Sequence, residues 1–181
     1  MKRFVTAILC VGACLSACKN DREEKCAFVP DAKGVPIDLK VEPLEDSLPS
    51  ITTKTQLVAF LTHHPNLRDH FFGRSRYPND SIFINELYRR FTNLAMDTLA
   101  MEAHHVFGNG SGLKEQFRSA FANIKYYYPE FKPPKIQTIV SGLETDLLVS
   151  DTLVVIGLDY FLGPGARYRP NMYEYMLRRY T

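Results

Sequence analysis

The sequence predicts an α+β domain that is mostly helical, with a small antiparallel β-sheet near residues 135–157. Three observations support this fold class. Apolar residues recur at helical spacing between residues 53 and 127. Two runs rich in β-branched residues, 136–140 and 152–156, follow the helical part. Apolar residues make up 45% of the 181-residue chain, which is enough to build a hydrophobic core.

The first 17 residues have the composition of a bacterial lipoprotein signal peptide. Lys2 and Arg3 give it a positively charged start, and an apolar run over residues 4–15 follows. This run is shorter than the ~20 apolar residues that a membrane-spanning helix needs. The tetrapeptide Leu15-Ser16-Ala17-Cys18 resembles a lipobox, so we expect Cys18 to receive a diacylglycerol and become the new N-terminus. The alternatives are an ordinary signal peptide with a chance cysteine, or an uncleaved helix.

The charge balance argues against a nucleic-acid-binding protein, and the cysteine content argues against a domain held by an intramolecular disulfide. The leader holds two of the 22 basic residues and none of the 20 acidic ones, so the rest of the chain is balanced. Such a balance predicts no nucleic-acid partner. Cys10 and Cys14 leave with the leader and Cys18 carries lipid, so Cys26 has no intramolecular disulfide partner.

Residues 18–50 are predicted to be a flexible tether. Four prolines and many charges interrupt the few apolar residues there, and such a composition favours an extended linker. Weak alternation over residues 35–41 predicts at most an edge strand. The folded domain is therefore expected at residues 51–181.

Residues that predict helices begin directly after residue 50. Thr53 and Gln56 have the spacing of a capping box, ahead of an apolar face that Pro65 ends. A short helical turn is expected over residues 66–73, followed by a loop over residues 74–80.

Two longer helices come next. Asp80 or Ser81 is expected to cap a long helix whose apolar positions continue to Leu99. That helix should stop before the glycine-rich stretch 108–112, because glycine breaks helices and favours turns. The next helix is marked by apolar positions from Leu113 to Ile124.

The sheet and the end of the chain complete the expected order. A third short run, 147–149, lies between the two β-branched runs, and Ser150-Asp151 has the composition of a tight turn. A loop over residues 157–169 leads to a last helix, 172–180, for which Asn171 is the expected cap.

Motifs for metal or nucleophilic chemistry are missing. The sequence contains no His-Glu-x-x-His helix; Glu102 and His105 share a helix face, but a di-metal site needs further carboxylates. Ser141-Gly142 lacks the Gly-x-Ser-x-Gly elbow, and the stretch 108–112 lacks the Gly-Lys-Ser/Thr of a phosphate-binding loop. We therefore expect no catalytic residue, no metal site and no cofactor.

The segment Gly157-Leu-Asp-Tyr-Phe-Leu-Gly163 is more informative. It follows a predicted strand and places the carboxylate of Asp159 among apolar residues, where a charge needs hydrogen-bond donors. We expect Asp159 to accept hydrogen bonds from backbone amides of this loop or to pair with an arginine. Gly157 and Gly163 are expected to let the chain leave the sheet and turn toward the last helix.

This segment also carries a family resemblance. The strand running into Gly157-Leu-Asp159, then Tyr168-x-Pro170, then the helix with Glu174-Tyr175 and Arg178-Arg179, resembles the gliding-motility lipoprotein B family (GldB) of Bacteroidota. The Tyr126-Tyr-Tyr-Pro-Glu130 motif and the lipobox agree with it. The resemblance implies a part in the envelope machinery for surface gliding, which is coupled to secretion. Members continue into a helical C-terminal half, so we expect this domain to be incomplete.

The family resembles remotely a class of predicted zinc peptidases, in which a β-hairpin leads into a His-Glu-x-x-His helix. Here the helix after the hairpin carries Tyr173, Glu174, Tyr175, Arg178 and Arg179 instead, so the resemblance implies that its metal ligands are missing. We expect a non-enzymatic lipoprotein that is anchored by Cys18, at the outer membrane, and that contacts envelope proteins of the gliding or secretion apparatus. Gly157, Asp159 and Gly163 are expected to be structural, and Tyr175 and Arg178 to be contact residues. The alternatives are a degenerate zinc-peptidase-like hydrolase and a periplasmic lipoprotein that binds a small ligand.

Overall fold

The computed structural model describes residues 30–32 and 34–180, and the elements below all belong to one compact unit, Ala32–Thr181. A four-stranded mixed sheet lies at its centre, with the strand order β1-β2-β4-β3. Its strands are β1 (Val41–Pro43), β2 (Lys135–Ile139), β3 (Leu147–Val149) and β4 (Leu153–Gly157). Because helices make up most of the remaining regular structure, the predicted α+β class is confirmed.

The antiparallel arrangement predicted for this sheet is wrong for two of its three pairings. β2 runs parallel to both β1 and β4, and only β3 runs antiparallel to β4. The chain reverses twice between β2 and β4, once over residues 140–146 and once at the predicted Ser150-Asp151 turn. The second turn is closed by a 2.8 Å hydrogen bond from the Ser150 amide to the Leu153 carbonyl. Two reversals restore the direction of β2 in β4.

The predicted tether is also wrong from Ala32 onward. Leu39, Leu44 and Leu48 are buried in the hydrophobic core, and β1 pairs with β2 at the edge of the sheet. Tertiary burial of these scattered leucines outweighs the linker-like composition around them. Residues 18–29 of the predicted tether, with Cys18 and Cys26, lie outside the described residues, as does the leader.

The helices follow the predicted order. They are α2 (Lys54–His63), η1 (Leu67–Phe71), η2 (Arg74–Arg76), α3 (Asp80–Phe91), α4 (Ala95–Phe107) and α5 (Ser111–Tyr127). The capping box at the start of α2 is confirmed, because Thr53 accepts from the Gln56 amide and Gln56 accepts from the Thr53 amide. Asn79, rather than Asp80 or Ser81, caps α3 by accepting from the Ile82 amide.

The long helix expected from residue 80 onward is interrupted at residues 92–94. Thr92 donates its hydroxyl to the Tyr88 carbonyl, and the side chain of Asn93 accepts from the Ala95 amide. Such side chains compete with helical backbone bonds and restart a helix in a new direction. Leu94, an expected core position, is therefore exposed in the break.

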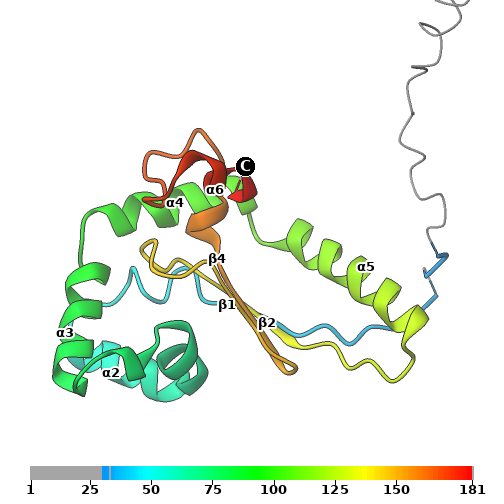
Figure 1. Cartoon of the computed structure of the whole chain (residues 1–181), viewed down its shortest axis with the longest axis horizontal. Helices are drawn as coiled ribbons and strands as arrows, with labels where there is room; N and C mark the ends of the chain where they lie inside the picture. The colour runs from blue at the N-terminus through cyan, green and yellow to red at the C-terminus, as the bar shows by residue number, and fades with distance from the viewer. Residues whose placement is uncertain (1–29, 33, 181) are drawn as a thin grey trace, which may run out of the picture. The chain divides into compact units, whose positions relative to one another are not determined.

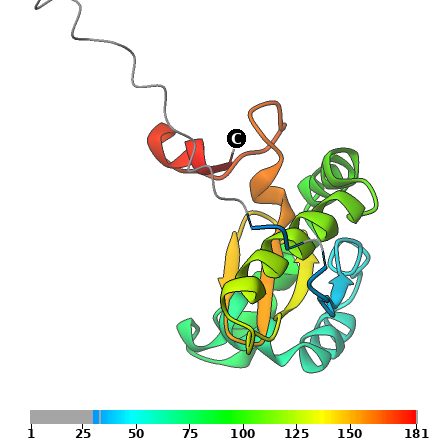
Figure 2. The same ribbon diagram turned by 90° about the vertical axis from the view of Figure 1, so that its right-hand side faces the viewer.

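The sheet is covered on both faces. Figures 1 and 2 show α5 on one face and α2 with α3 on the other. Every residue of β4 and all but Lys135 of β2 are buried, as expected for parallel strands between two helical layers. None of the helices among the described residues is long and apolar enough to cross a membrane.

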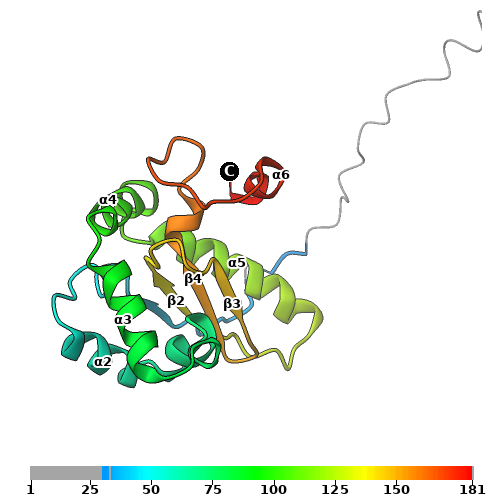
Figure 3. The ribbon, with the colours of Figure 1, turned by 60° about the vertical axis from the view of Figure 1, so that its left-hand side comes forward.

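The chain leaves β4 through a short helix and ends in an irregular segment. η3 (Leu158–Phe161) follows β4 directly, and Figure 3 shows it leading toward α6 (Glu174–Leu177). η4 (Arg178–Tyr180) follows α6. The predicted helix 172–180 is thus shortened, and Asn171 is not its cap; the tighter turn of η4 directs Tyr180 inward, where it is buried.

Candidate functional site

The carboxylate of Asp159 joins the ends of the two central strands. Asp159 follows β4, and its Oδ1 accepts from the Ser141 amide, just after β2, at 2.9 Å. Its Oδ2 accepts from the Leu143 amide at 2.5 Å and from the Ser141 hydroxyl at 3.1 Å. We call this arrangement of Asp159, Ser141 and Leu143 the Asp159 clamp. The sequence predicted backbone donors from the loop of Asp159; in the structure, the amides of Ser141 and Leu143 in the loop after β2 donate as well.

The clamp is deeply buried and conformationally constrained. Asp159 is only 1% exposed, and burial raises its pKa, while the bonds from Ser141 and Leu143 lower it. Among the described residues, Leu143 is the only one other than glycine with a positive φ, at 58°. Left-handed backbone is unfavourable for a residue with a Cβ, so the surrounding bonds must hold it there. Tyr160 adds such a bond, because its hydroxyl donates to the Leu143 carbonyl at 3.0 Å.

The last residues of the C-terminal segment, as we call residues 163–180, pack beside the Asp159 clamp. The segment begins with a turn in which Gly163 has a φ of 84°. The ring of Tyr180 lies 5.3 Å from that of Tyr160, and its hydroxyl donates to Asp146 at 2.7 Å. Burial raises the pKa of Tyr180 to about 12, so this hydroxyl remains a donor at neutral pH.

Two tyrosines of the C-terminal segment are exposed to solvent. Tyr173 and Tyr175 stack on each other with their ring centroids 5.8 Å apart, and they are 74% and 69% exposed. The segment is also rich in arginine: Arg167, Arg169, Arg178 and Arg179 are all exposed. Tyrosine and arginine are, with tryptophan, the residue types enriched at interface hot spots.

The structure brings some of the predicted site residues together. Gly157 is the last residue of β4, and Asp159 follows it in η3. Gly163, Tyr175 and Arg178 lie further along, in the C-terminal segment. The sequence predictions missed the clamp partner Leu143 and the hydroxyl groups of Tyr160 and Tyr180. No local pattern marks them, because their roles depend on contacts between separate loops.

The histidines do not gather into a metal site. Among residues 30–32 and 34–180, no group of three or more His, Cys, Asp or Glu side chains is placed to hold a metal ion. His104 instead pairs with Asp46, with 2.7 Å between its Nε2 and the carboxylate.

The His104 pair predicts a small pH dependence of stability. The hydrogen bond that His104 donates to the Asp46 carboxylate raises the pKa of His104 above its usual 6.5. Its contribution is therefore complete below pH 6.5 and is lost as the pH rises through the raised pKa. An exposed pair contributes at most about 1 kcal/mol. Thermal unfolding of His104→Gln should show a weaker loss of stability between pH 6 and 9 than the parent chain. His105→Gln, at an exposed neighbouring position, is the control and should retain the parent slope.

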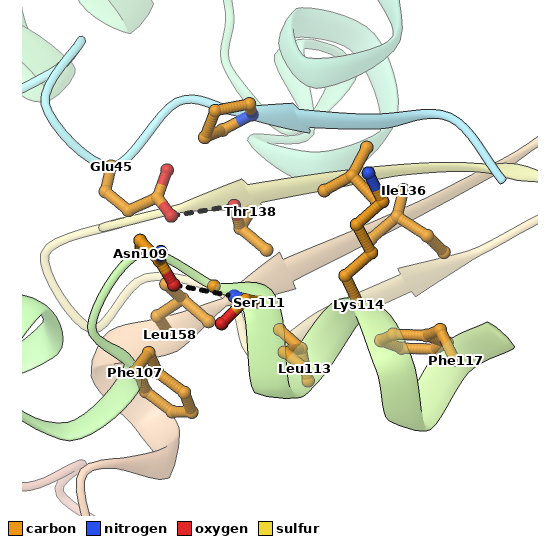
Figure 4. A pocket seen from close by; sticks show the side chains of 13 residues that line it. Glu45, Phe107, Asn109, Ser111, Leu113, Lys114, Phe117, Ile136, Thr138 and Leu158 are labelled. Atoms are coloured by element: carbon orange, nitrogen blue, oxygen red, sulfur yellow. Dashed lines mark hydrogen bonds between the residues drawn. The ribbon is translucent and has the colours of Figure 1, made fainter. Parts of the chain in front are cut away.

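A cavity opens between β1 and α5. It measures about 300 Å³, and its walls come from β1, β2, the α4–α5 connection and α5. Figure 4 shows Glu45 just after β1 and Lys114 extending from α5 toward the strands, so we call it the Glu45–Lys114 cavity. The sequence predictions missed it, because it exists only once the chain around β1 packs against the sheet.

Comparison with known proteins identifies a family. A family model described as gliding motility protein GldB matches residues 25–181, which include the Asp159 clamp, the cavity and the C-terminal segment. No curated protein and no solved structure matches the chain.

Proposed function

The chain belongs to the family of gliding motility protein GldB, and we propose that it is a lipid-anchored part of the gliding apparatus that acts by contact with other envelope proteins. Its family is one of gliding-motility lipoproteins, in agreement with the lipobox that ends at Cys18. Acyl chains on Cys18 would hold the domain at a membrane of the cell envelope, which we propose to be the outer membrane.

One observation carries the contact proposal: the stacked, exposed pair of Tyr173 and Tyr175. Tyrosine is enriched at protein interfaces, and the stacked pair presents a contiguous exposed aromatic surface. Burial of Leu177 and Tyr180 fixes the segment behind the pair. We propose that Tyr175 and Arg178 contact the partner protein together with Tyr173.

The double variant Tyr173→Ala/Tyr175→Ala tests this surface. In a gliding bacterium whose own copy is deleted, we expect the variant to accumulate normally at the membrane but not to restore gliding. Both side chains are exposed, so the Tm of the purified chain should stay within about 2 °C of the parent value.

The control removes a similar aromatic area elsewhere. Tyr126 and Tyr127 are also exposed and lie in edge-to-face contact at the end of α5. Tyr126→Ala/Tyr127→Ala should restore gliding. Normal gliding with the Tyr173→Ala/Tyr175→Ala chain would contradict contact through the C-terminal segment, and normal gliding with Cys18→Ala would contradict the lipid anchor.

We propose no catalytic activity. Among the described residues, Asp159 has the most deeply buried carboxylate, and it already accepts three hydrogen bonds from Ser141 and Leu143, so it is engaged in holding the fold. The rival proposal, a degenerate zinc-peptidase-like hydrolase, predicts zinc that survives dialysis and is lost when His104 and His105 are changed to alanine. Metal analysis of the purified chain distinguishes the two.

A second candidate function, binding of a small ligand, is favoured by one observation. The Glu45–Lys114 cavity, at about 300 Å³, lies at the lower end of the ~300–1,000 Å³ range of ligand pockets. Such binding is compatible with a contact role, because the cavity and the Tyr173–Tyr175 pair involve different residues.

A further inference from the structure

We infer that the Glu45–Lys114 cavity binds a zwitterion with an apolar body, the chemical class of apolar α-amino acids and short apolar peptides. This inference rests on the second candidate function and names its ligand. It does not depend on contact through Tyr173 and Tyr175, which do not line the cavity.

The body of the cavity is apolar. Ile136 and Leu158, which are almost completely buried, contribute to its lining. The partly buried side chains of Phe107, Leu113 and Phe117 line it from α4 and α5. A volume of about 300 Å³ suits a single amino acid or a dipeptide rather than a long acyl chain. An apolar body would gain free energy by displacing water from these walls.

A buried hydroxyl fixes the negative charge of the cavity. Thr138 is 4% exposed, and its hydroxyl donates to the Glu45 carboxylate at 3.0 Å. Because the donor lies in the central strand β2, the carboxylate is positioned before any ligand arrives. Figure 4 shows this bond on the wall beside β1.

The positive charge comes from Lys114, an exposed residue of α5. Lys114 rises from the first turns of α5, as Figure 4 shows. Within the described part of the chain, neither Glu45 nor Lys114 has an ion-pair partner within 4.0 Å, and they do not pair with each other. The apolar cavity thus carries two opposite charges that remain apart.

A zwitterion satisfies both charges with one molecule. A simple anion would pair with Lys114 and be repelled by Glu45, and a simple cation would meet the reverse problem. A zwitterion can direct its ammonium to Glu45 and its carboxylate to Lys114 while its apolar part fills the space between them. Discrimination against singly charged molecules follows from the unfavourable charge as much as from the favourable one.

Isothermal titration with leucine and leucyl-leucine tests the inference. The chain from residue 19 onward, which has no lipid anchor, should bind at least one of these two probes. Acetylation removes the ammonium and amidation removes the carboxylate, and either capped form should bind roughly tenfold more weakly, because each loses a charge-assisted bond.

Two variants test whether Glu45 binds the ammonium of the ligand and Lys114 binds its carboxylate. Glu45→Gln keeps an acceptor for Thr138 and should weaken binding of the free peptide without affecting the acetylated one. Lys114→Met should weaken binding of the free peptide without affecting the amidated one. Glu130→Gln and Lys132→Met, at positions outside the cavity, are the controls and should bind like the parent.

Two results would overturn the inference, and they differ in what else they affect. Equal affinity for free and doubly capped peptides would retain a small-ligand pocket but exclude a zwitterion as its ligand. Absence of binding by any form would exclude the second candidate function as well. Neither result bears on the gliding test with Tyr173 and Tyr175.

Discussion

Asp159→Ala is expected to lower the free energy of unfolding by about 3–5 kcal/mol, since one buried and one partly buried amide lose their acceptor at about 1–3 kcal/mol each. These amides belong to Ser141 and Leu143, and the latter must stay in the left-handed conformation without the bond that holds it. For a domain of this size such a loss lowers the Tm by about 10 °C. Thermal unfolding followed by circular dichroism measures it.

The conservative variant and a surface control sharpen this prediction. Asp159→Asn keeps one acceptor oxygen but turns an NH₂ group toward the second amide, so we expect about half the loss. Asp151→Asn changes an exposed aspartate in the turn between β3 and β4 and should leave the Tm unchanged. A parent-like Tm for Asp159→Ala together with lost gliding would move Asp159 from the scaffold to the functional surface.

Gly157→Ala is expected to be about as damaging. A Cβ at this position would lie 2.3 Å from the Thr145 carbonyl oxygen, a backbone atom that cannot rotate away. The Thr145 hydroxyl is itself bonded to the Phe71 carbonyl at 2.9 Å, so the loop cannot easily retreat. Overpacking against fixed backbone costs about 3 kcal/mol or more. Urea titration should therefore show a clearly lower midpoint.

Another glycine in the same region provides the matched control. A Cβ at Gly165 would meet no other atom within 4 Å, and the backbone there is not left-handed. Gly165→Ala should keep the parent midpoint or raise it slightly, because alanine reduces the entropy of the unfolded chain. If both alanine variants unfold at the same urea concentration, the close approach at Gly157 does not constrain the fold.

The elements that could be predicted from sequence are those with a strong local signal. The capping box at Thr53 and the apolar period of α5 depend on residues within one or two turns, so the sequence carries them directly. β1 has only three residues, and its strand conformation depends on pairing with β2, which no local window contains. One feature of the sequence does indicate the parallel pairing of β4. Its apolar run is uninterrupted, which is typical of a strand buried on both faces.

In the candidate site, too, some features could be predicted from the sequence and others depend on tertiary packing. A carboxylate among apolar residues must find donors, so the burial of Asp159 and its bonds to backbone amides could be predicted. The identity of the donors depends on how the loop after β2 meets η3, which is a tertiary property. Glu45 and Lys114 are ordinary charged residues in the sequence, and only the packing of α5 beside β1 brings both of them to one cavity.

The pairing of β1 with β2 also has a consequence for the order of folding. Glu42 and Gln137 are joined by a side-chain hydrogen bond across 95 residues of sequence, and their strands lie side by side in parallel. During synthesis, residues 32–51 emerge first but have no strand to join until β2 has been made. Contacts of such long range slow folding, because a large loop must close before they form. The segment nearest to the proposed anchor is therefore expected to be among the last to gain protection from hydrogen exchange.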